Sequence, residues 1–179
     1  LTQGSTDVPL NELGREQARI TGAHLAREGW DAMYASDLSR ARETASIIGE
    51  ATGVGPIYTD RRLRERGFGE AEGLGARARR ALYRDGTAIP GAEPWEDVRS
   101  RGIAALEEIA RRHNGERILL VSHGGVIITV LTLLSGETIT PGNPLLKNLS
   151  MSLLTYENEW SIAWYNRLAP ELEDEPVSA

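Results

Sequence analysis

The sequence predicts an α/β fold with three layers, in which helices cover both faces of a mainly parallel central sheet. Amphipathic segments of helix length alternate with short apolar runs along the chain, and that order of elements produces parallel sheets. In addition, the apolar run over residues 117–122 leads into His123-Gly124-Gly125 and then into an apolar stretch of helix length, Val126 to Leu134. A strand that delivers a polar residue to a helix start is typical of ligand sites in open α/β sheets.

The first half of the chain predicts two helices and two short strands. The expected elements are a helix over 12–27, a strand over 30–35, a helix over 38–51 and a weak strand over 56–58. Asn11 is placed to cap the first helix, and Gly29 and Gly53 follow the two helices as stop signals. Strand and helix alternate here as a βαβ arrangement requires.

The second half begins with an excursion from this pattern over residues 67–95, which are rich in Gly, Arg and Pro. The elements expected around and after it are a short helical piece near 76–83, an amphipathic helix over 96–113, a buried strand over 117–122, and strands over 151–156 and 161–165. The last two strands form a hairpin at the edge of the sheet. We expect one domain over residues 1–179, with an acidic tail over 170–179.

Composition excludes several classes of site and partner. The chain has 179 residues, 40% of them hydrophobic, and no cysteine, which excludes disulfides and thiolate sites and fits the cytoplasm. The net charge of −6 argues against nucleic acid as a partner, and no apolar stretch is long enough for a membrane. The three histidines include no pair at helical spacing, so we expect no metal site.

His123 and Arg40 are the first two candidates for chemistry. His123 ends a strand and precedes Gly124-Gly125 at a helix start, a position that favours function over a purely structural role. Arg40 lies within the first two turns of a helix, where its guanidinium and the helix N-terminus both favour phosphate. A solvated arginine on the helix surface is the alternative for Arg40, and for Arg42 we prefer it.

Glu65 is the third candidate. It is flanked in sequence by Arg64 and Arg66 and is followed by glycine-rich chain. A carboxyl group held in a cleft can act as a general acid toward a leaving group. The alternative is an exposed ion pair with a neighbouring arginine, and the residues taken alone favour that alternative.

Together and in order, these segments resemble the motifs of the histidine phosphatase superfamily, also called the phosphoglycerate mutase-like family. The matching segments are Gln3-Gly4 with Asp7 and Pro9-Leu10, the run from Ser36 to Ala41, Leu63-Arg64-Glu65 with Phe68-Gly69 and Glu72-Gly73, Pro90 to Glu93, and Ser122 to Gly125. Ala92 replaces a glycine of the family pattern. Because the likeness covers nearly the whole chain, it implies the phosphoglycerate mutase-like fold.

The resemblance also implies an activity. The chain would be a metal-independent phosphomonoesterase acting through a phosphohistidine on a small phosphorylated metabolite, without a cofactor. Arg40 and His123 would bind the phosphoryl group, and Glu65 would protonate the leaving oxygen. The backbone of Gln3-Gly4 and of Gly124-Gly125 would line the substrate pocket. The partner is then a small-molecule phosphate ester.

One family motif is not among these residues. Members of the family open with a strand ending in Arg-His-Gly, whose histidine is the nucleophile, and this sequence begins just after the position of that strand. We expect the segment to exist outside the given sequence. Two alternatives are a non-catalytic phosphate-binding pseudoenzyme and a strand supplied by another chain.

Two further alternatives concern activity and assembly. A phosphoglycerate mutase would use the same pocket, but the short excursion over residues 67–95 favours a phosphatase. An unrelated nucleotide-binding domain has no support, because neither glycine-rich phosphate motif occurs in the chain. A homodimer that pairs through the hairpin edge stays open.

Overall fold

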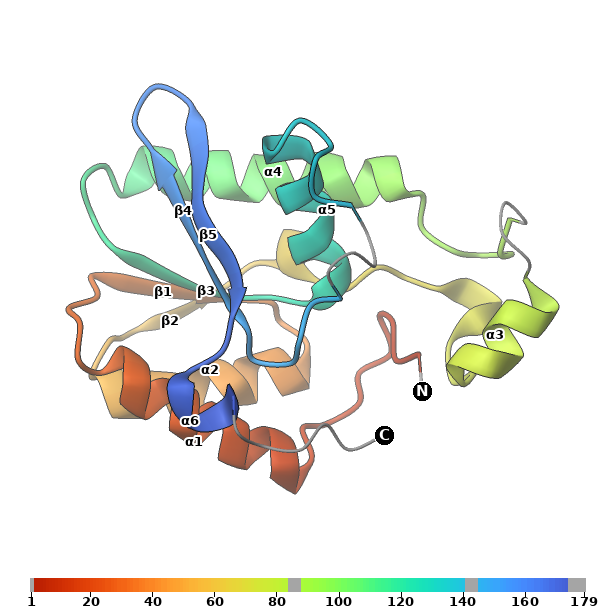
Figure 1. Ribbon diagram of the computed structural model, residues 1–179, viewed down its shortest axis with the longest axis horizontal. Coiled ribbons are helices and arrows are strands. Elements are labelled where there is room, and N and C mark those ends of the chain that lie inside the picture. Colours follow the sequence, from red (N-terminus) through yellow and green to blue (C-terminus); the bar gives the residue numbers. More distant parts are fainter. Residues whose placement is uncertain (1, 84–87, 141–144, 174–179) are drawn as a thin grey trace.

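The computed structural model describes residues 2–83, 88–140 and 145–173 (Figure 1). The elements are α1 (Glu12–Leu25), β1 (Ala32–Ala35), α2 (Ser39–Thr52), β2 (Ile57–Thr59), the 3-10 turns η1 (Arg61–Leu63) and η2 (Gly69–Ala71), α3 (Ala76–Leu82), α4 (Trp95–Arg112), β3 (Ile118–Val121), α5 (Gly124–Leu134), β4 (Met151–Tyr156), β5 (Trp160–Arg167) and α6 (Pro170–Glu173). The expected elements are all present, with ends that differ by a few residues. Residues 84–87 of the excursion and 174–179 of the acidic tail lie outside the described part.

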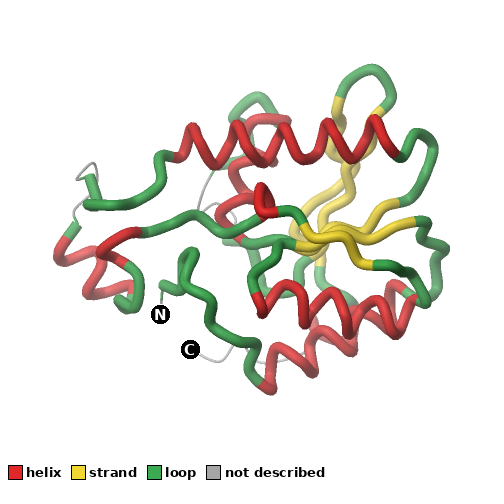
Figure 2. Tube along the Cα trace, turned by 180° about the vertical axis from the view of Figure 1, so that it is seen from behind, coloured by secondary structure: helices red, strands yellow, loops and turns green. Residues whose placement is uncertain are grey.

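A three-stranded parallel sheet forms the middle layer, with β1 between β2 and β3. The side chains of β1 alternate between two cores: Ala32 and Tyr34 pack in the core that contains α4 residues, and Met33 and Ala35 pack in the core that contains α2 residues. Helices therefore lie on both sides of the sheet (Figure 2). A strand covered on both faces needs apolar side chains at every position, and the expected three-layer α/β fold is confirmed.

β3 differs from the expectation of a buried strand. Each of its residues, Ile118 to Val121, is partly exposed, because among the described strands β3 lies at the edge of the sheet and pairs only with β1. The hairpin also differs: β4 and β5 form an antiparallel sheet of their own, and within the described part of the chain neither strand pairs with the parallel sheet. Leu120 of β3 and Leu154 of β4 nevertheless pack against the same core cluster.

Local signals set the ends of the first two helices. The Asn11 side chain accepts a hydrogen bond from Gly14 N at 2.8 Å and caps α1, as expected. Gly53 ends α2 with a φ of 72°, a left-handed conformation that glycine adopts without strain. Among the described residues, no helix is both long and apolar enough to span a membrane.

Candidate active site

The topology brings the three candidate side chains to one end of the sheet. Because Ala35 of β1 is in register with Val121 of β3, the chain leaves both strands at the same edge. Arg40 follows one of these strands and His123 the other. The charge of Arg40 acts on His123, and the charge of Glu65 acts on Arg40. Glu65 also accepts a hydrogen bond from Gly125, two residues after His123.

His123 is buried, with 8% of its surface exposed. Within the described part of the chain, its Nε2 atom has no hydrogen-bond partner. Burial, followed by the positive charges of Arg40 and Arg101, lowers the pKa of His123 to about 3. The imidazole is therefore neutral at pH 7, and one of its ring nitrogens is buried without a hydrogen bond to any described residue.

Arg40 is held by two backbone carbonyls. Its Nη1 donates to Thr6 O at 2.9 Å and its Nη2 donates to Gly4 O at 2.7 Å. No ion pair among the described residues includes Arg40, and burial lowers the pKa of Arg40 below its ordinary value. The guanidinium stays charged and keeps further N–H donors for an anion.

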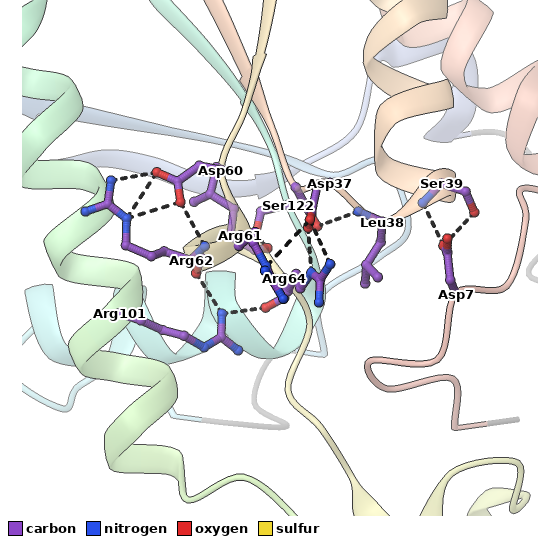
Figure 3. A network of polar contacts seen from close by, with 12 residues as sticks. Asp7, Asp37, Leu38, Ser39, Asp60, Arg61, Arg62, Arg64, Arg101 and Ser122 are labelled. Atoms are coloured by element: carbon purple, nitrogen blue, oxygen red, sulfur yellow. Dashed lines mark hydrogen bonds and ion pairs between the residues drawn. The ribbon is translucent and has the colours of Figure 1, made fainter.

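The N-terminus of α2 is occupied by a carboxylate of the protein itself. Asp7 Oδ1 accepts hydrogen bonds from Ser39 N and Ser39 Oγ, both at 2.7 Å (Figure 3). These bonds from Ser39 lower the pKa of Asp7 below its usual range. The expectation that this helix end offers its N–H groups to phosphate is therefore wrong in part, and Arg40 is the group left for an anion. Arg42 is exposed, as preferred from the sequence.

Glu65 lies at the start of α5. Its Oε2 accepts from Gly125 N at 3.1 Å and its Oε1 from Arg66 N at 2.7 Å. A Cβ at position 125 would lie 2.3 Å from Glu65 Oε1, so only glycine lets the carboxylate approach this closely. Among the described residues Glu65 forms no ion pair, which argues against the alternative of a surface pair.

This arrangement changes the expected lining of the substrate pocket. The Gly125 amide, expected at the substrate, donates to Glu65 instead. Gly124, the first residue of α5, is exposed. At the other predicted backbone segment, Gly4 is buried and the Gln3 side chain is exposed. Gly4 O is taken by Arg40.

The segment that carries Glu65 is anchored by residues from distant parts of the chain. Arg101 on α4 donates from Nη1 to Arg62 O at 2.7 Å and to Arg64 O at 2.6 Å (Figure 3). The same guanidinium pairs with both oxygens of Glu93, at 2.7 and 2.9 Å. Sequence reasoning missed Arg101, because nothing in an amphipathic helix shows which of its arginines reaches a carbonyl.

Two more contacts fix the same segment. Ser122 Oγ donates to Leu63 O at 2.9 Å and ties it to the end of β3. Arg64 pairs with Asp37 through two hydrogen bonds of 2.6 and 2.7 Å, and these bonds from Arg64 lower the pKa of Asp37 below its usual range. Glu65 thus projects from a fixed turn.

A cavity of about 500 Å³ opens beside Glu65. Its lining residues are Ser5, Arg61, Arg64, Glu65, Gly67, Gly91, Ala92, Glu93 and Arg101. Five of these residues are charged, and part of the lining comes from the excursion. A larger cavity, of about 760 Å³, lies between the end of α5 and β5, and none of the candidate residues lines it.

Comparison with known proteins decides the family. The family model of the histidine phosphatase superfamily (branch 1) matches residues 1–167. The chain belongs to this superfamily. The uncharacterized phosphatase PhoE of Bacillus subtilis (strain 168) is 34% identical over 165 residues, which are 92% of this chain and 84% of that protein.

Two other members of the histidine phosphatase superfamily carry more specific names. The metal-independent phosphoserine phosphatase of Arabidopsis thaliana is 35% identical over 137 residues, which are 70% of this chain and 58% of that protein. The solved structure of a mycobacterial glucosyl-3-phosphoglycerate phosphatase superimposes with a TM-score of 0.83 at 27% identity, over 94% of this chain and 92% of that one. The resemblance and the fold inferred from the motifs are therefore confirmed, and the chain is a phosphatase by family.

Proposed function

We propose that the protein is a metal-independent phosphomonoesterase that acts on a small phosphorylated metabolite through a phosphohistidine. The observation that carries the proposal is the buried, neutral His123, whose Nε2 has no partner in the described part of the chain, with Arg40 close by. The Arabidopsis thaliana relative, a metal-independent phosphoserine phosphatase, supports independence from metal.

In this proposal Arg40 and His123 bind the phosphoryl oxygens. Charge spread over these oxygens in the transition state calls for fixed donors, and Arg40 is held in place by the carbonyls of Gly4 and Thr6. The pKa of His123 rises when an anion is placed beside it, because the anion favours the imidazolium. A substrate phosphate therefore makes His123 a stronger donor.

The nucleophile is a second histidine, on a strand that pairs with the free edge of β3. Support comes from β3 itself, which has one neighbouring strand among the residues that the structure describes and is partly exposed along its length. That strand would end beside His123, since parallel neighbours end at the same edge of a sheet.

The reaction then proceeds in two steps. The nucleophilic nitrogen bonds to phosphorus while the ester P–O bond breaks, and Glu65, as the general acid, gives a proton to the leaving oxygen. Water next attacks the phosphohistidine, Glu65 takes a proton from that water, and inorganic phosphate leaves with the histidine regenerated. The cavity beside Glu65 is where the leaving alcohol would sit.

The first test uses the product of the complete gene. Its intact mass should exceed that of these 179 residues by on the order of 20 residues, about one strand and its loop. An unchanged mass favours a pseudoenzyme or a strand from another chain. On acid-free quenching with substrate, the active protein should carry an acid-labile, alkali-stable phosphoryl group.

The second test replaces His123. His123→Ala should abolish hydrolysis of phosphate monoesters and leave the unfolding midpoint nearly unchanged, while the control His24→Gln, on α1, keeps its activity. Turnover by His123→Ala at the wild-type rate would refute the proposal. Conversion of 3-phosphoglycerate to its isomer without release of phosphate would identify a mutase instead.

A further inference from the structure

The loop of residues 4–6 is held by hydrogen bonds to two side chains, Arg40 and Glu72. On one side, its carbonyls accept the two hydrogen bonds of Arg40. On the other side, its amides and hydroxyls donate to the carboxylate of Glu72, as Ser5 N at 2.9 Å, Ser5 Oγ at 3.1 Å, Thr6 N at 3.1 Å and Thr6 Oγ1. The loop therefore lies between a cation that binds its acceptors and an anion that binds its donors.

Glu72 also contacts the segment that follows Glu65. Glu72 Oε1 accepts from Phe68 N at 3.0 Å, three residues after Glu65. One carboxylate thus joins the loop that holds Arg40 to the segment that carries Glu65. Within the described part of the chain, no other side chain hydrogen-bonds to both segments.

The fit around this carboxylate is close. Gly4 has a φ of +59°, and a Cβ at this position would lie 2.1 Å from Glu72 Oε1. The backbones on either side also pair: Thr2 N donates to Leu74 O and Gly73 N to Thr2 O, both at 2.8 Å. Burial raises the pKa of Glu72, but hydrogen bonds from Thr6, Phe68 and Ser5 outweigh it, so the pKa lies below its ordinary value. The carboxylate is ionised at neutral pH.

We propose that Glu72 is a positioning residue, which sets the place of Arg40 relative to Glu65 through the loop of residues 4–6. This inference rests on the proposed function, in which Arg40 binds the phosphoryl group and Glu65 protonates the leaving oxygen. Glu72 itself touches neither the substrate nor the reacting atoms. Its effect reaches the reaction through Thr6 O and Gly4 O, the two acceptors that orient the guanidinium.

The test compares Glu72→Gln with Glu70→Gln. Glutamine keeps the size of Glu72 but turns an NH₂ group toward hydrogen-bond donors. The loop then loses part of the hydrogen bonds that Ser5 and Thr6 donate to Glu72. Glu70 lies two residues away and is exposed; its side chain accepts, in the described part of the chain, only from Tyr83 at 3.3 Å. In the product of the complete gene, Glu72→Gln should lower kcat/KM for p-nitrophenyl phosphate on the order of 10- to 100-fold, and Ki for inorganic phosphate should rise in parallel. Glu70→Gln should match the wild type.

A double-mutant cycle separates positioning from general support of the fold. Arg40→Lys keeps the charge but cannot bridge two carbonyls as a planar fork. If Glu72 acts through Arg40, adding Glu72→Gln to Arg40→Lys costs much less than it costs in the wild type. Fully additive losses, or a Glu72→Gln protein that behaves like Glu70→Gln, overturn the inference.

Two further measurements keep the outcome decisive. If Glu72→Gln does not fold, Thr6→Val removes one donor to Glu72 while leaving the carboxylate, and should produce a smaller loss of the same kind; no loss would overturn the inference. Wild-type protein that neither hydrolyses p-nitrophenyl phosphate nor binds inorganic phosphate refutes the proposed function. An active wild type with an unaffected Glu72→Gln refutes only the positioning role.

Discussion

Two loops of this molecule are held by the same device, an arginine that donates to two carbonyls spaced two residues apart. Arg101 binds Arg62 O and Arg64 O and so fixes the turn before Glu65. Arg40 binds Gly4 O and Thr6 O and so fixes the loop of residues 4–6. The difference lies in the rest of each guanidinium: Arg101 also pairs with Glu93 through two hydrogen bonds, and Arg40 has no such carboxylate among the described residues.

That difference separates anchoring from binding. A partly buried charge without a partner is costly, and proteins keep such groups mostly where a ligand supplies the missing charge. Arg101 is satisfied by the protein and serves the fold. Arg40 is incompletely satisfied by the described residues, and its charge acts on the neutral imidazole of His123. The comparison therefore predicts opposite consequences when each arginine is removed.

Arg40→Ala should give the largest effect on activity. Without the guanidinium, the transferring phosphoryl group loses a fixed cation, and kcat/KM should fall by about 100- to 1000-fold. The affinity for inorganic phosphate should fall as well, while the unfolding midpoint shifts less than for a variant at Arg101. Steady-state kinetics, calorimetric phosphate titration and thermal unfolding measure the three quantities. An Arg40→Ala protein with normal phosphate affinity would contradict the role of Arg40 in binding the phosphoryl group.

Arg101→Met should act mainly on stability. The substitution leaves Glu93 and two carbonyls without their donor, and breaking a largely buried pair costs about 3 kcal/mol of unfolding free energy. Urea unfolding measures this, with Arg111→Met as the control because Arg111 is exposed near the end of the same helix. If Arg101→Met is as stable as the control and loses activity as Arg40→Ala does, Arg101 does not serve the fold while Arg40 binds the ligand.

The pKa of His123 offers a further test of the two arginines, because the charges of both Arg40 and Arg101 lower it. Burial first, and then Arg40 and Arg101, lower its pKa to about 3 from 6.5. Between these values the unfolded chain binds a proton that the folded chain does not, so stability present above pH 6.5 is lost as the pH falls. The unfolding free energy should therefore decrease by about 2 kcal/mol more between pH 7 and pH 5 in the wild type than in His123→Gln. Parallel pH dependences of the two proteins would contradict this assignment.

Much of the fold was predictable because its signals are local. Asn11 and Gly53 mark helix ends by their own hydrogen bonding and backbone freedom, and the run Ile118–Val121 is apolar throughout because both faces of β3 meet a core. The exposure of β3 and the separate sheet of the hairpin were not predictable. Both depend on which strand lies next to β3, and a strand's own residues do not encode its neighbour.

The site divides in the same way. His123, Arg40 and Glu65 were identified from their positions next to strand ends and glycines. Sequence reasoning assigned the N-terminus of α2 to phosphate and the backbone at the start of α5 to the substrate pocket, whereas Asp7 and Glu65 accept hydrogen bonds from these two segments. These carboxylates lie 32 and 60 positions away in the chain from the amides they accept, and no local pattern reports such a pairing. The hydrogen bonds that Glu72 accepts from residues 5, 6 and 68 were not predicted, for the same reason.

Gly125→Ala should give the smallest and most selective effect on activity. It disturbs the segment that carries Glu65 at one point, the contact between Gly125 and Glu65. The new methyl group would meet Glu65 Oε1 and push the acid away from the Gly125 amide. An alkyl phosphate needs its leaving oxygen protonated, so its kcat should fall by about tenfold, at the low end of what general acid catalysis contributes. p-Nitrophenyl phosphate leaves as a stabilised phenolate and should be nearly unaffected. Gly29→Ala is the control, because a Cβ there meets nothing within 4 Å. Equal losses with both substrates would mean that the methyl group displaces the phosphoryl group rather than the acid, and Glu65 would then lose its assigned role.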